Sequence, residues 1–261
     1  MNLRDYVSNR MANENARIKN SKLSFDTPSS VDEIVNLYRT YDGMKRHMRA
    51  LSPEKVQEYL DKGYAFVGAY YDKELAGIAV SKELPTDYPY FTLPKEEEKG
   101  SVFTLGGLYV RSEFQGMGLA SKLSRIVTQG TEQYATESNN VVGMAYEVSY
   151  DNFGSLRILS QYGNYIGFYS DNTKQEGLTI LLYRPYLHDP IKVDRPNIQL
   201  TYDEESSLQS LTDGLNYLSQ QEQIGGAITT VREVDNAVVT SNILNRTPST
   251  IPETTFEMIK W

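Results

Sequence analysis

One stretch in the middle of the chain constrains the fold most, because it combines a strand pattern, a glycine turn and a helix pattern. Residues 101–130 read SVFTLGGLYVRSEFQGMGLASKLSRIVTQG. The β-branched and aromatic run from Val102 to Val110 predicts a buried strand. A turn with two glycines follows at residues 115–118, and apolar residues at helical spacing come next. Gly130 is the expected end of that helix.

A strand, a glycine turn and a helix in this order form an anion site. The first N–H groups of the helix have no partner within it, and the helix dipole favours negative charge. Gly116 and Gly118 carry no side chain that would keep a phosphate away. A dinucleotide-binding fingerprint would need a third glycine where Ser121 stands, and a Walker loop would need a Gly-Lys-Ser/Thr tripeptide, which the sequence lacks. The alternative is an ordinary structural turn.

Two motifs indicate what the anion is. The spacing Gln115-x-x-Gly118-x-Ala120, after Leu108-Tyr109-Val110, resembles the acyl-CoA-binding motif of the GCN5-related N-acetyltransferases, the GNAT family. A second motif of that family is matched by Asn152, Ser155, an apolar helix and a glycine eleven residues after the asparagine.

The order of the expected elements is also similar to that family. Over about residues 22–185 it reads β-α-α-β-β-β-α-β-α-β-β, with strands at 65–71, 75–84 and 141–150 among them. The resemblance therefore covers roughly two-thirds of the chain. It implies the GNAT acyl-CoA N-acyltransferase fold. This is an α/β fold (mixed α+β) in which helices flank a central mixed sheet.

The resemblance implies acetyl-CoA as the acyl donor. The backbone of Leu108 and Val110 would bind the pantetheine arm, and a backbone N–H near Leu108 would stabilise the oxyanion of the tetrahedral intermediate. The alternatives are core packing for these two residues and a helix cap for Asn152. The expected cofactor-binding residues are Leu108, Tyr109, Val110, Gln115, Gly116, Met117, Gly118, Leu119, Ala120 and Asn152.

The catalytic acid departs from the family's pattern. Many members have a tyrosine seven residues after the motif asparagine, where this chain has Leu159. Tyr162 follows three residues later, nearly one helical turn on, and is the candidate acid.

The catalytic base departs from the pattern as well. Thr104 stands where the histone-modifying branch has a carboxylate. Glu147, the only charged residue in its strand, is the candidate base, because burial would raise its pKa towards useful values. The alternatives are a solvent-facing Glu147, a pairing with Arg111 or Arg157, and proton transfer through water with no dedicated base.

Composition excludes other classes of protein. The chain of 261 residues has a net charge of −8, which disfavours nucleic-acid binding and is favourable for a cationic amine. It has no cysteine and two histidines, which disfavours a metal site. No apolar run approaches the ~20 residues of a membrane span, and the polar N-terminus lacks a secretory signal. We expect a cytoplasmic protein without membrane or nucleic-acid partners.

Charge and proline spacing divide the chain into three parts. Residues 1–22 hold five basic and two acidic side chains and predict a polar arm or a short surface helix, of which the solvated arm is favoured. Residues 23–185 form the GNAT domain. Residues 186–261 hold eleven acidic and five basic side chains, with a predicted helix over 208–218 and a hairpin of 227–234 with 237–244. This extension is open to three interpretations: a substrate-selecting lid, an oligomerisation arm that forms a homodimer, or a structural cover for the sheet edge.

The sequence thus predicts an N-acetyltransferase that moves an acetyl group from acetyl-CoA to a primary amine of a small molecule or protein. The alternative is a catalytically weak, CoA-binding regulatory protein, which Thr104 and Leu159 favour.

Overall fold

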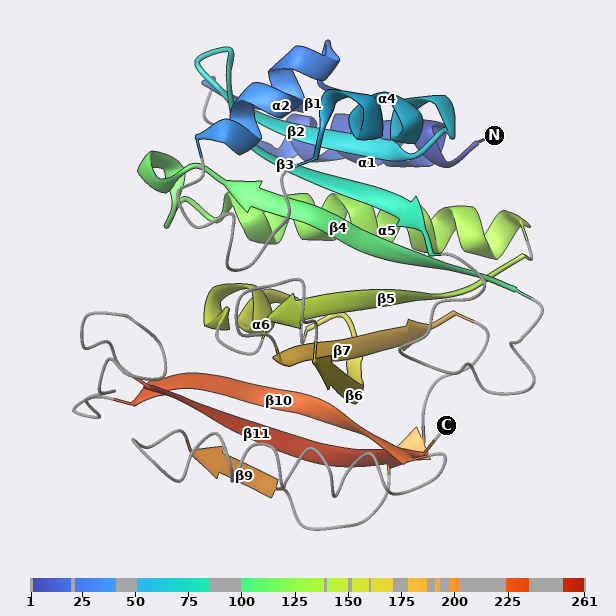
Figure 1. Cartoon of the computed structure of the whole chain (residues 1–261), viewed down its shortest axis with the longest axis vertical. Coiled ribbons are helices and arrows are strands. Elements are labelled where there is room, and N and C mark those ends of the chain that lie inside the picture. The colour runs from blue at the N-terminus through green and yellow to red at the C-terminus, as the bar shows by residue number, and fades with distance from the viewer. Residues whose placement is uncertain are drawn as a thin grey trace. The chain divides into compact units, whose positions relative to one another are not determined.

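The computed structural model shows two compact units, each described by itself (Figure 1). The first comprises Met1–Tyr88, Lys99–Glu147 and Asn172–Glu176, and the second Pro89–Glu98, Val148–Asp171 and Gly177–Trp261. The structure describes residues 2–19, 22–40, 51–84, 100–138, 140–149, 152–159, 161–170, 178–186, 191–192, 198–201, 224–234 and 251–260. Within those ranges no helix combines the length and the apolar character needed to cross a bilayer.

The first unit is a mixed sheet with helices on both faces. The sheet order is β1-β2-β3-β4-β5; neighbours are antiparallel except β4 and β5, which are parallel. The strands are β1 (Leu23–Asp26), β2 (Ala65–Tyr71), β3 (Glu74–Glu83), β4 (Ser101–Val110) and β5 (Val141–Ser149). The helices are α1 (Leu3–Arg17), α2 (Val31–Arg39), α4 (Pro53–Asp61), the 3₁₀ turn η1 (Ser112–Phe114) and α5 (Leu119–Ser138).

Local sequence signals account for several of these elements. Asp72 and Lys73, at φ 50° and 71°, make the tight turn between β2 and β3 that the sequence predicts. Ser52 caps α4 by accepting a hydrogen bond of 3.2 Å from the Lys55 amide, with Pro53 at the first helical position.

The two faces of the sheet bury different helices. On one face lies α5, where the hydroxyls of Ser81 and Thr131 are 2.8 Å apart and fully buried. On the other face α2 and α4 pack on an apolar cluster that includes Ile34, Phe66 and Ile78. The predicted mixed sheet flanked by helices is confirmed.

The N-terminal residues differ from the solvated arm that their charge predicts. They form α1, which packs along α5 (Figure 1) and buries residues at helical spacing: Leu3, Tyr6, Val7, Met11 and Glu14. Asn15 connects the helix to β1 by two hydrogen bonds of 2.8 Å. Its Nδ2 donates to the Phe25 carbonyl, and its Oδ1 accepts from the Phe25 amide. The few apolar residues decide the outcome because they all fall on one face.

Gly130 does not end the helix, contrary to the sequence prediction. Helix α5 continues to Ser138, and Gly130 lies in its interior against α1. A Cβ at Gly130 would lie 2.8 Å from Val7 Cγ2 and 3.0 Å from Val7 Cα. The glycine is therefore explained by the close approach of two helices.

The described part of the second unit contains α6 (Phe153–Leu159) and six strands. They are β6 (Asn164–Ser170), β7 (Leu178–Pro185), β8 (Ile191–Lys192), β9 (Ile198–Thr201), β10 (Ile224–Val234) and β11 (Ile251–Lys260). Strand β6 pairs with β7 and, through Gly226, with β10.

The first strand of the predicted C-terminal hairpin forms as β10, and the structure describes β11 as its partner. Antiparallel to β10 runs β11, with Val234 opposite Ile251 and Ile224 opposite Lys260. Residues 237–244 and the predicted helix over 208–218 lie outside the described residues.

Candidate functional site

Strand β4 carries a bulge in the middle of the motif-bearing stretch. Against β3, Gly106 stands opposite Val80 and Tyr109 opposite Ile78, so two residues of β4, Gly107 and Leu108, occupy the space of one. Gly107 has φ 58°, a left-handed conformation that side chains disfavour. A Cβ at Gly107 would also overlap the hydroxyl of Tyr38. Glycine is therefore required at this bulge.

Helix α2 holds the bulge in place through Tyr38. The Tyr38 hydroxyl donates a 3.0 Å hydrogen bond to the Gly107 carbonyl, and the side chain is 1% exposed. Burial raises the pKa of Tyr38, so the phenol stays protonated and remains a donor. Beside it, the Tyr109 hydroxyl lies 3.2 Å from Thr40 Oγ1.

Among the described residues, the C-terminal half of β4 pairs with a strand along one edge only, the edge next to β3. Its register with β5 runs from Ser101 to Leu105, whereas its register with β3 continues to Val110. The Arg111 amide donates towards β3, to the Ala76 carbonyl at 2.9 Å. Because peptide groups alternate along a strand, those of Val110 and Leu108 face the side without a strand ladder.

The glycine turn after β4 is open and its backbone is left-handed at both glycines. Gly116 has φ 82° and Gly118 φ 72°, and a Cβ at either would meet nothing within 4 Å. Residues 115–118 are exposed, and the side-chain amide of Gln115 donates to the Val110 carbonyl at 3.3 Å. The turn is therefore tied to the end of β4.

The turn presents donors for an anion. The Lys122 amide bonds the Gly118 carbonyl at 3.2 Å, so the amides of residues 119–121 precede the first helical bond of α5. Left-handed glycines followed by helical amides form a concave set of N–H groups, and the helix dipole adds to their attraction for negative charge.

The basic residues beside the turn are engaged with carboxylates. Arg111 pairs with Glu74 and with Glu113. Arg125 binds both carboxylate oxygens of the buried Glu14, at 2.7 and 2.6 Å. The backbone is thus the main source of positive potential that the turn offers to a ligand.

Glu147 lies near the end of β5 and is half-buried. Its neighbour Tyr146 points to α5, with its hydroxyl 3.2 Å from Thr128 Oγ1. By strand alternation, Glu147 points to the opposite face, the face covered by α2 and α4. Thr104 shares this face, because its pairing partner is Ala145. Thr104 is 3% exposed.

The remaining predicted site residues belong to the second unit. Asn152 caps α6, accepting a 3.2 Å hydrogen bond from the Ser155 amide, as one of the two sequence interpretations states. Tyr162 lies just after α6 and is half-buried, and its amide donates to the Leu159 carbonyl at 2.9 Å. Leu159 itself is 3% exposed.

The β4 residues, the glycine turn and Glu147 thus all belong to the first unit. Sequence analysis missed the part that Tyr38 plays at the bulge. Its position on the apolar face of α2 was apparent from helical spacing, but nothing in the sequence indicates that its hydroxyl meets a glycine 69 residues away.

Comparisons with known proteins give one family. The sequence profile of the acetyltransferase (GNAT) family matches residues 31–163. No curated protein matches the sequence. Among solved structures, Arabidopsis thaliana NAA60 in complex with acetyl-CoA matches with a TM-score of 0.48 and 16% identity, over 64% of this chain and 99% of that one. An N-acetyltransferase from Staphylococcus aureus Mu50 matches with a TM-score of 0.47 and 12% identity, over 64% and 99%. The ribosomal-protein-S18-alanine N-acetyltransferase from Escherichia coli matches with a TM-score of 0.44 and 12% identity, over 63% and 94%.

Proposed function

The chain belongs to the acetyltransferase (GNAT) family, and on that premise we propose that it is an N-acetyltransferase. It moves an acetyl group from acetyl-CoA directly to a primary amine of a small molecule or a protein. The observation that carries the proposal is the combination, in one unit, of the β4 bulge with the open glycine turn. The hydrogen bond from Gln115 to the Val110 carbonyl joins the two.

Each part has a role in holding the donor. The amides at the start of α5 bind the pyrophosphate, and the outward-facing backbone of Leu108 and Val110 binds the pantetheine arm. For Asn152, the cap of α6, we propose contact with the same arm as its second role. A donor held in this way reacts with a neighbouring amine as an intramolecular partner would, which removes much of the entropic barrier.

The reaction needs a base that takes a proton from the acceptor ammonium and an acid that gives a proton to the leaving thiolate. The amine nitrogen attacks the thioester carbonyl, so a C–N bond forms, and the C–S bond breaks as the tetrahedral intermediate collapses. The Leu108 amide stabilises the oxyanion of that intermediate. Glu147 accepts the proton that the ammonium loses, and Tyr162 gives a proton to the leaving thiolate.

A second candidate function has its own support. Thr104 and Leu159 occupy the two positions where the family often has titratable groups, and both are buried. A protein of this kind would bind acetyl-CoA and regulate a partner, with little transfer of its own. Acceptor-dependent release of CoA separates the two functions.

Calorimetric titration with acetyl-CoA tests the donor site. Gly118→Trp places an indole in the open space at the turn and is expected to weaken binding on the order of 100-fold, because several charge-assisted hydrogen bonds to phosphate are lost. Gly63→Trp is the matched control, since Gly63 also has a left-handed φ of 80° with nothing within 4 Å of a Cβ. Equal affinity of folded Gly118→Trp and wild type would disprove the site.

Release of CoA thiol with a panel of amines tests the reaction. A primary-amine acceptor is expected to release CoA in the wild type, and Glu147→Gln and Tyr162→Phe are expected to slow kcat and to alter its pH profile. Binding of acetyl-CoA without release by any amine would favour the regulatory function.

A further inference from the structure

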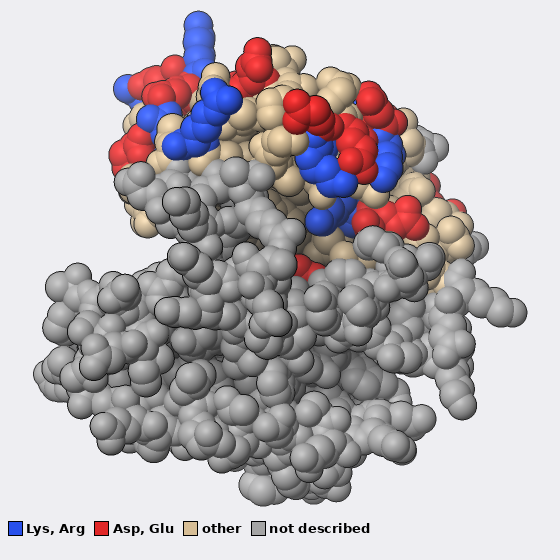
Figure 2. All heavy atoms as spheres, in the orientation of Figure 1, with Lys and Arg blue, Asp and Glu red and all other residues tan. Residues whose placement is uncertain are grey.

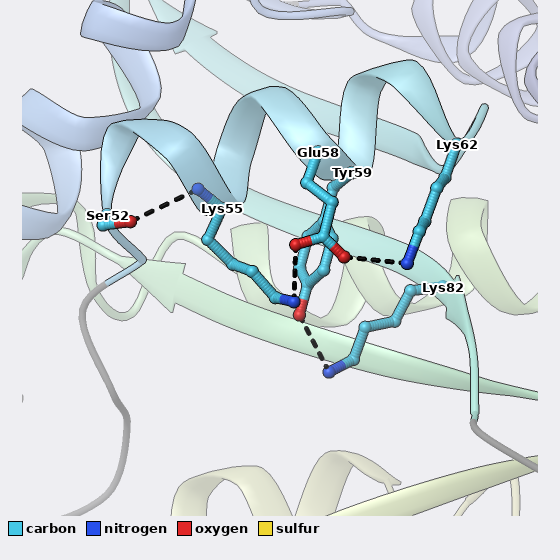
Figure 3. Close-up of polar contacts among 6 residues, drawn as sticks. All are labelled: Ser52, Lys55, Glu58, Tyr59, Lys62 and Lys82. Carbon is cyan, nitrogen blue, oxygen red and sulfur yellow. Dashed lines mark hydrogen bonds and ion pairs between the residues drawn. The ribbon is translucent and has the colours of Figure 1, made fainter.

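A half-buried lysine lies on the α2 and α4 face of the sheet without a carboxylate of its own. Lys82, in β3, has its Nζ 3.4 Å from the Tyr59 hydroxyl and 5.5 Å from the centre of the Tyr59 ring (Figure 3). Among the residues that the structure describes, no carboxylate lies within 4.0 Å of this ammonium group.

Two further lysines, Lys55 in α4 and Lys62 at its C-terminal cap, complete a cluster near Tyr59. Lys55 and Lys62 each bind one oxygen of Glu58 at 2.7 Å. The Lys55 ammonium also lies 5.2 Å from the centre of the Tyr59 ring. Figure 3 shows Lys55, from α4, and Lys82, from β3, converging on the hydroxyl end of Tyr59. We call Lys55, Lys62 and Lys82 the lysine cluster.

The charges of the cluster do not cancel. Two ammonium groups, those of Lys55 and Lys62, share the Glu58 carboxylate, and Lys82 adds a third positive charge beside the Tyr59 ring, which is 8% exposed. Two cations drawn to one ring repel each other unless an anion lies between them. An oxyanion beside the Tyr59 hydroxyl would accept hydrogen bonds from Lys55 and Lys82 and relieve this repulsion.

The surroundings favour a single small anionic group over a polyanion. On the face of the first unit seen in Figure 2, basic and acidic side chains are interspersed, and no continuous basic surface extends from α4. The whole chain is acidic, with a net charge of −8. A nucleic acid would need a broader basic surface.

The cluster adjoins the part of β4 where transfer is proposed to occur. Lys82 pairs with Thr104 in the sheet, and its Cε lies 3.3 Å from where a Cβ on Gly106 would stand. Gly106 immediately precedes the bulge at Gly107 and Leu108. The side chain of Lys82 therefore lies over the backbone beside the bulge, on the same sheet face as Glu147.

We propose that the lysine cluster binds a carboxylate or phosphate group carried by the acceptor, so that the substrate is an amine with an oxyanion close to it. The inference rests on the proposed N-acetyltransferase function and names its substrate class. It differs from the cationic acceptor that net charge alone favours, because the three ammonium groups of the cluster outnumber its one carboxylate, which binds two of them.

Matched acceptors test the proposal. In the CoA-release assay, each anionic amine is compared with its neutral counterpart: an amino acid with its amide, a peptide beginning with aspartate with one beginning with asparagine, and phosphoserine with serine. The anionic member of at least one pair is expected to have a kcat/KM at least about 10-fold higher, from hydrogen bonds between charged groups. The pair that responds shows whether a free amino acid, a peptide or a phosphorylated compound supplies the anion.

Substitutions assign the preference to the cluster. Lys82→Gln is expected to abolish it and Lys82→Arg to retain it. The matched control is Lys73→Gln, which makes the same charge change nine residues earlier, in the turn that precedes β3, about 30 Å away at the rise of a strand. A wild type that prefers neutral or cationic amines, or a preference that survives in Lys82→Gln, would overturn the proposal.

A measurement without acetyl-CoA separates this inference from the proposed function. At constant ionic strength, inorganic phosphate is expected to raise the Tm of the wild type and of Lys73→Gln more than that of Lys82→Gln. Equal shifts in all three would refute an anion site at the cluster, even if transfer is observed. Failure of acetyl-CoA to bind would instead refute the transferase, and with it the identity of the anion as part of an acceptor.

Discussion

The contact between the Tyr38 hydroxyl and Gly107 allows a prediction about the stability of two variants that both affect this one oxygen atom. Tyr38→Phe removes the hydroxyl that donates to the Gly107 carbonyl at 3.0 Å. Gly107→Ala adds a methyl group that would overlap that same hydroxyl, at a residue with φ 58°. The two substitutions act on one space, so their effects on the free energy of unfolding are not expected to add.

The magnitudes follow from the contacts. Tyr38→Phe is expected to cost about 1–2 kcal/mol, because a partly buried carbonyl loses its donor. Gly107→Ala is expected to cost about 1–2 kcal/mol for the left-handed backbone and about 1–3 kcal/mol more for displacing the Tyr38 side chain. In the Tyr38→Phe background the atoms nearest to the new methyl group are at 3.5 Å, an ordinary contact. The alanine then costs only the backbone contribution.

Urea unfolding of the two single variants and the double variant measures this coupling. The double variant is expected to lose about 1–3 kcal/mol less than the sum of the single variants. Because the chain has two compact units, the unfolding curves from circular dichroism and tyrosine fluorescence must coincide before free energies are compared. Gly63→Ala is the control: it shares the positive φ but has open space, so it should add to Tyr38→Phe. Full additivity of Tyr38→Phe with Gly107→Ala would refute the contact.

Two other perturbations test the packing of α1 and the ion pairs of α4. Gly130→Ala, which would stabilise an ordinary helix by about 1 kcal/mol, is expected to destabilise α5 by about 1–3 kcal/mol, because Val7 Cγ2 lies 2.8 Å from the new Cβ. A gain of stability in urea would show that α1 does not pack against α5 at this point. Hydrogen bonds from Lys55 and Lys62 lower the pKa of Glu58 from 4.5 to about 2. The Glu58 carboxylate therefore stabilises the fold fully above pH 4.5, the pKa of the unfolded state, and this stabilisation is lost as the pH falls through the folded-state pKa of about 2. The Tm difference between wild type and Glu58→Gln should therefore be present near neutral pH and vanish near about pH 2, and a constant difference would contradict the pairing.

Much of the first unit could be predicted from local sequence signals. The apolar runs at 65–71 and 75–84 and the turn at Asp72 and Lys73 specify a hairpin whichever elements lie beside it. Ser52 and Pro53 mark the start of α4 in the same way. These predictions succeed because the forces behind them act between residues a few positions apart.

The errors arise where distant segments meet. Glycine commonly follows the last turn of a helix, yet Gly130 lies inside α5. The side chain of Val7 is too close to the position where a Cβ at residue 130 would lie. The pairing of β10 with residues 251–260 was not predicted either, since β pairing depends on a partner surface and not on adjacency in the chain. Similarly, α1 is a helix because α5 and β1 accept its one apolar face.

The sequence alone determined the strand, the glycine turn and the start of the helix that follows it, and with them the positions of the amides that face an anion. Those features follow from the β-branched and aromatic run before the turn and from the backbone freedom of Gly116 and Gly118. Only the tertiary structure decided that Tyr38 holds the β4 bulge and that Lys82 meets Lys55 beside Tyr59. Such contacts join residues far apart in the chain, and their geometry depends on packing between elements, which no local pattern encodes.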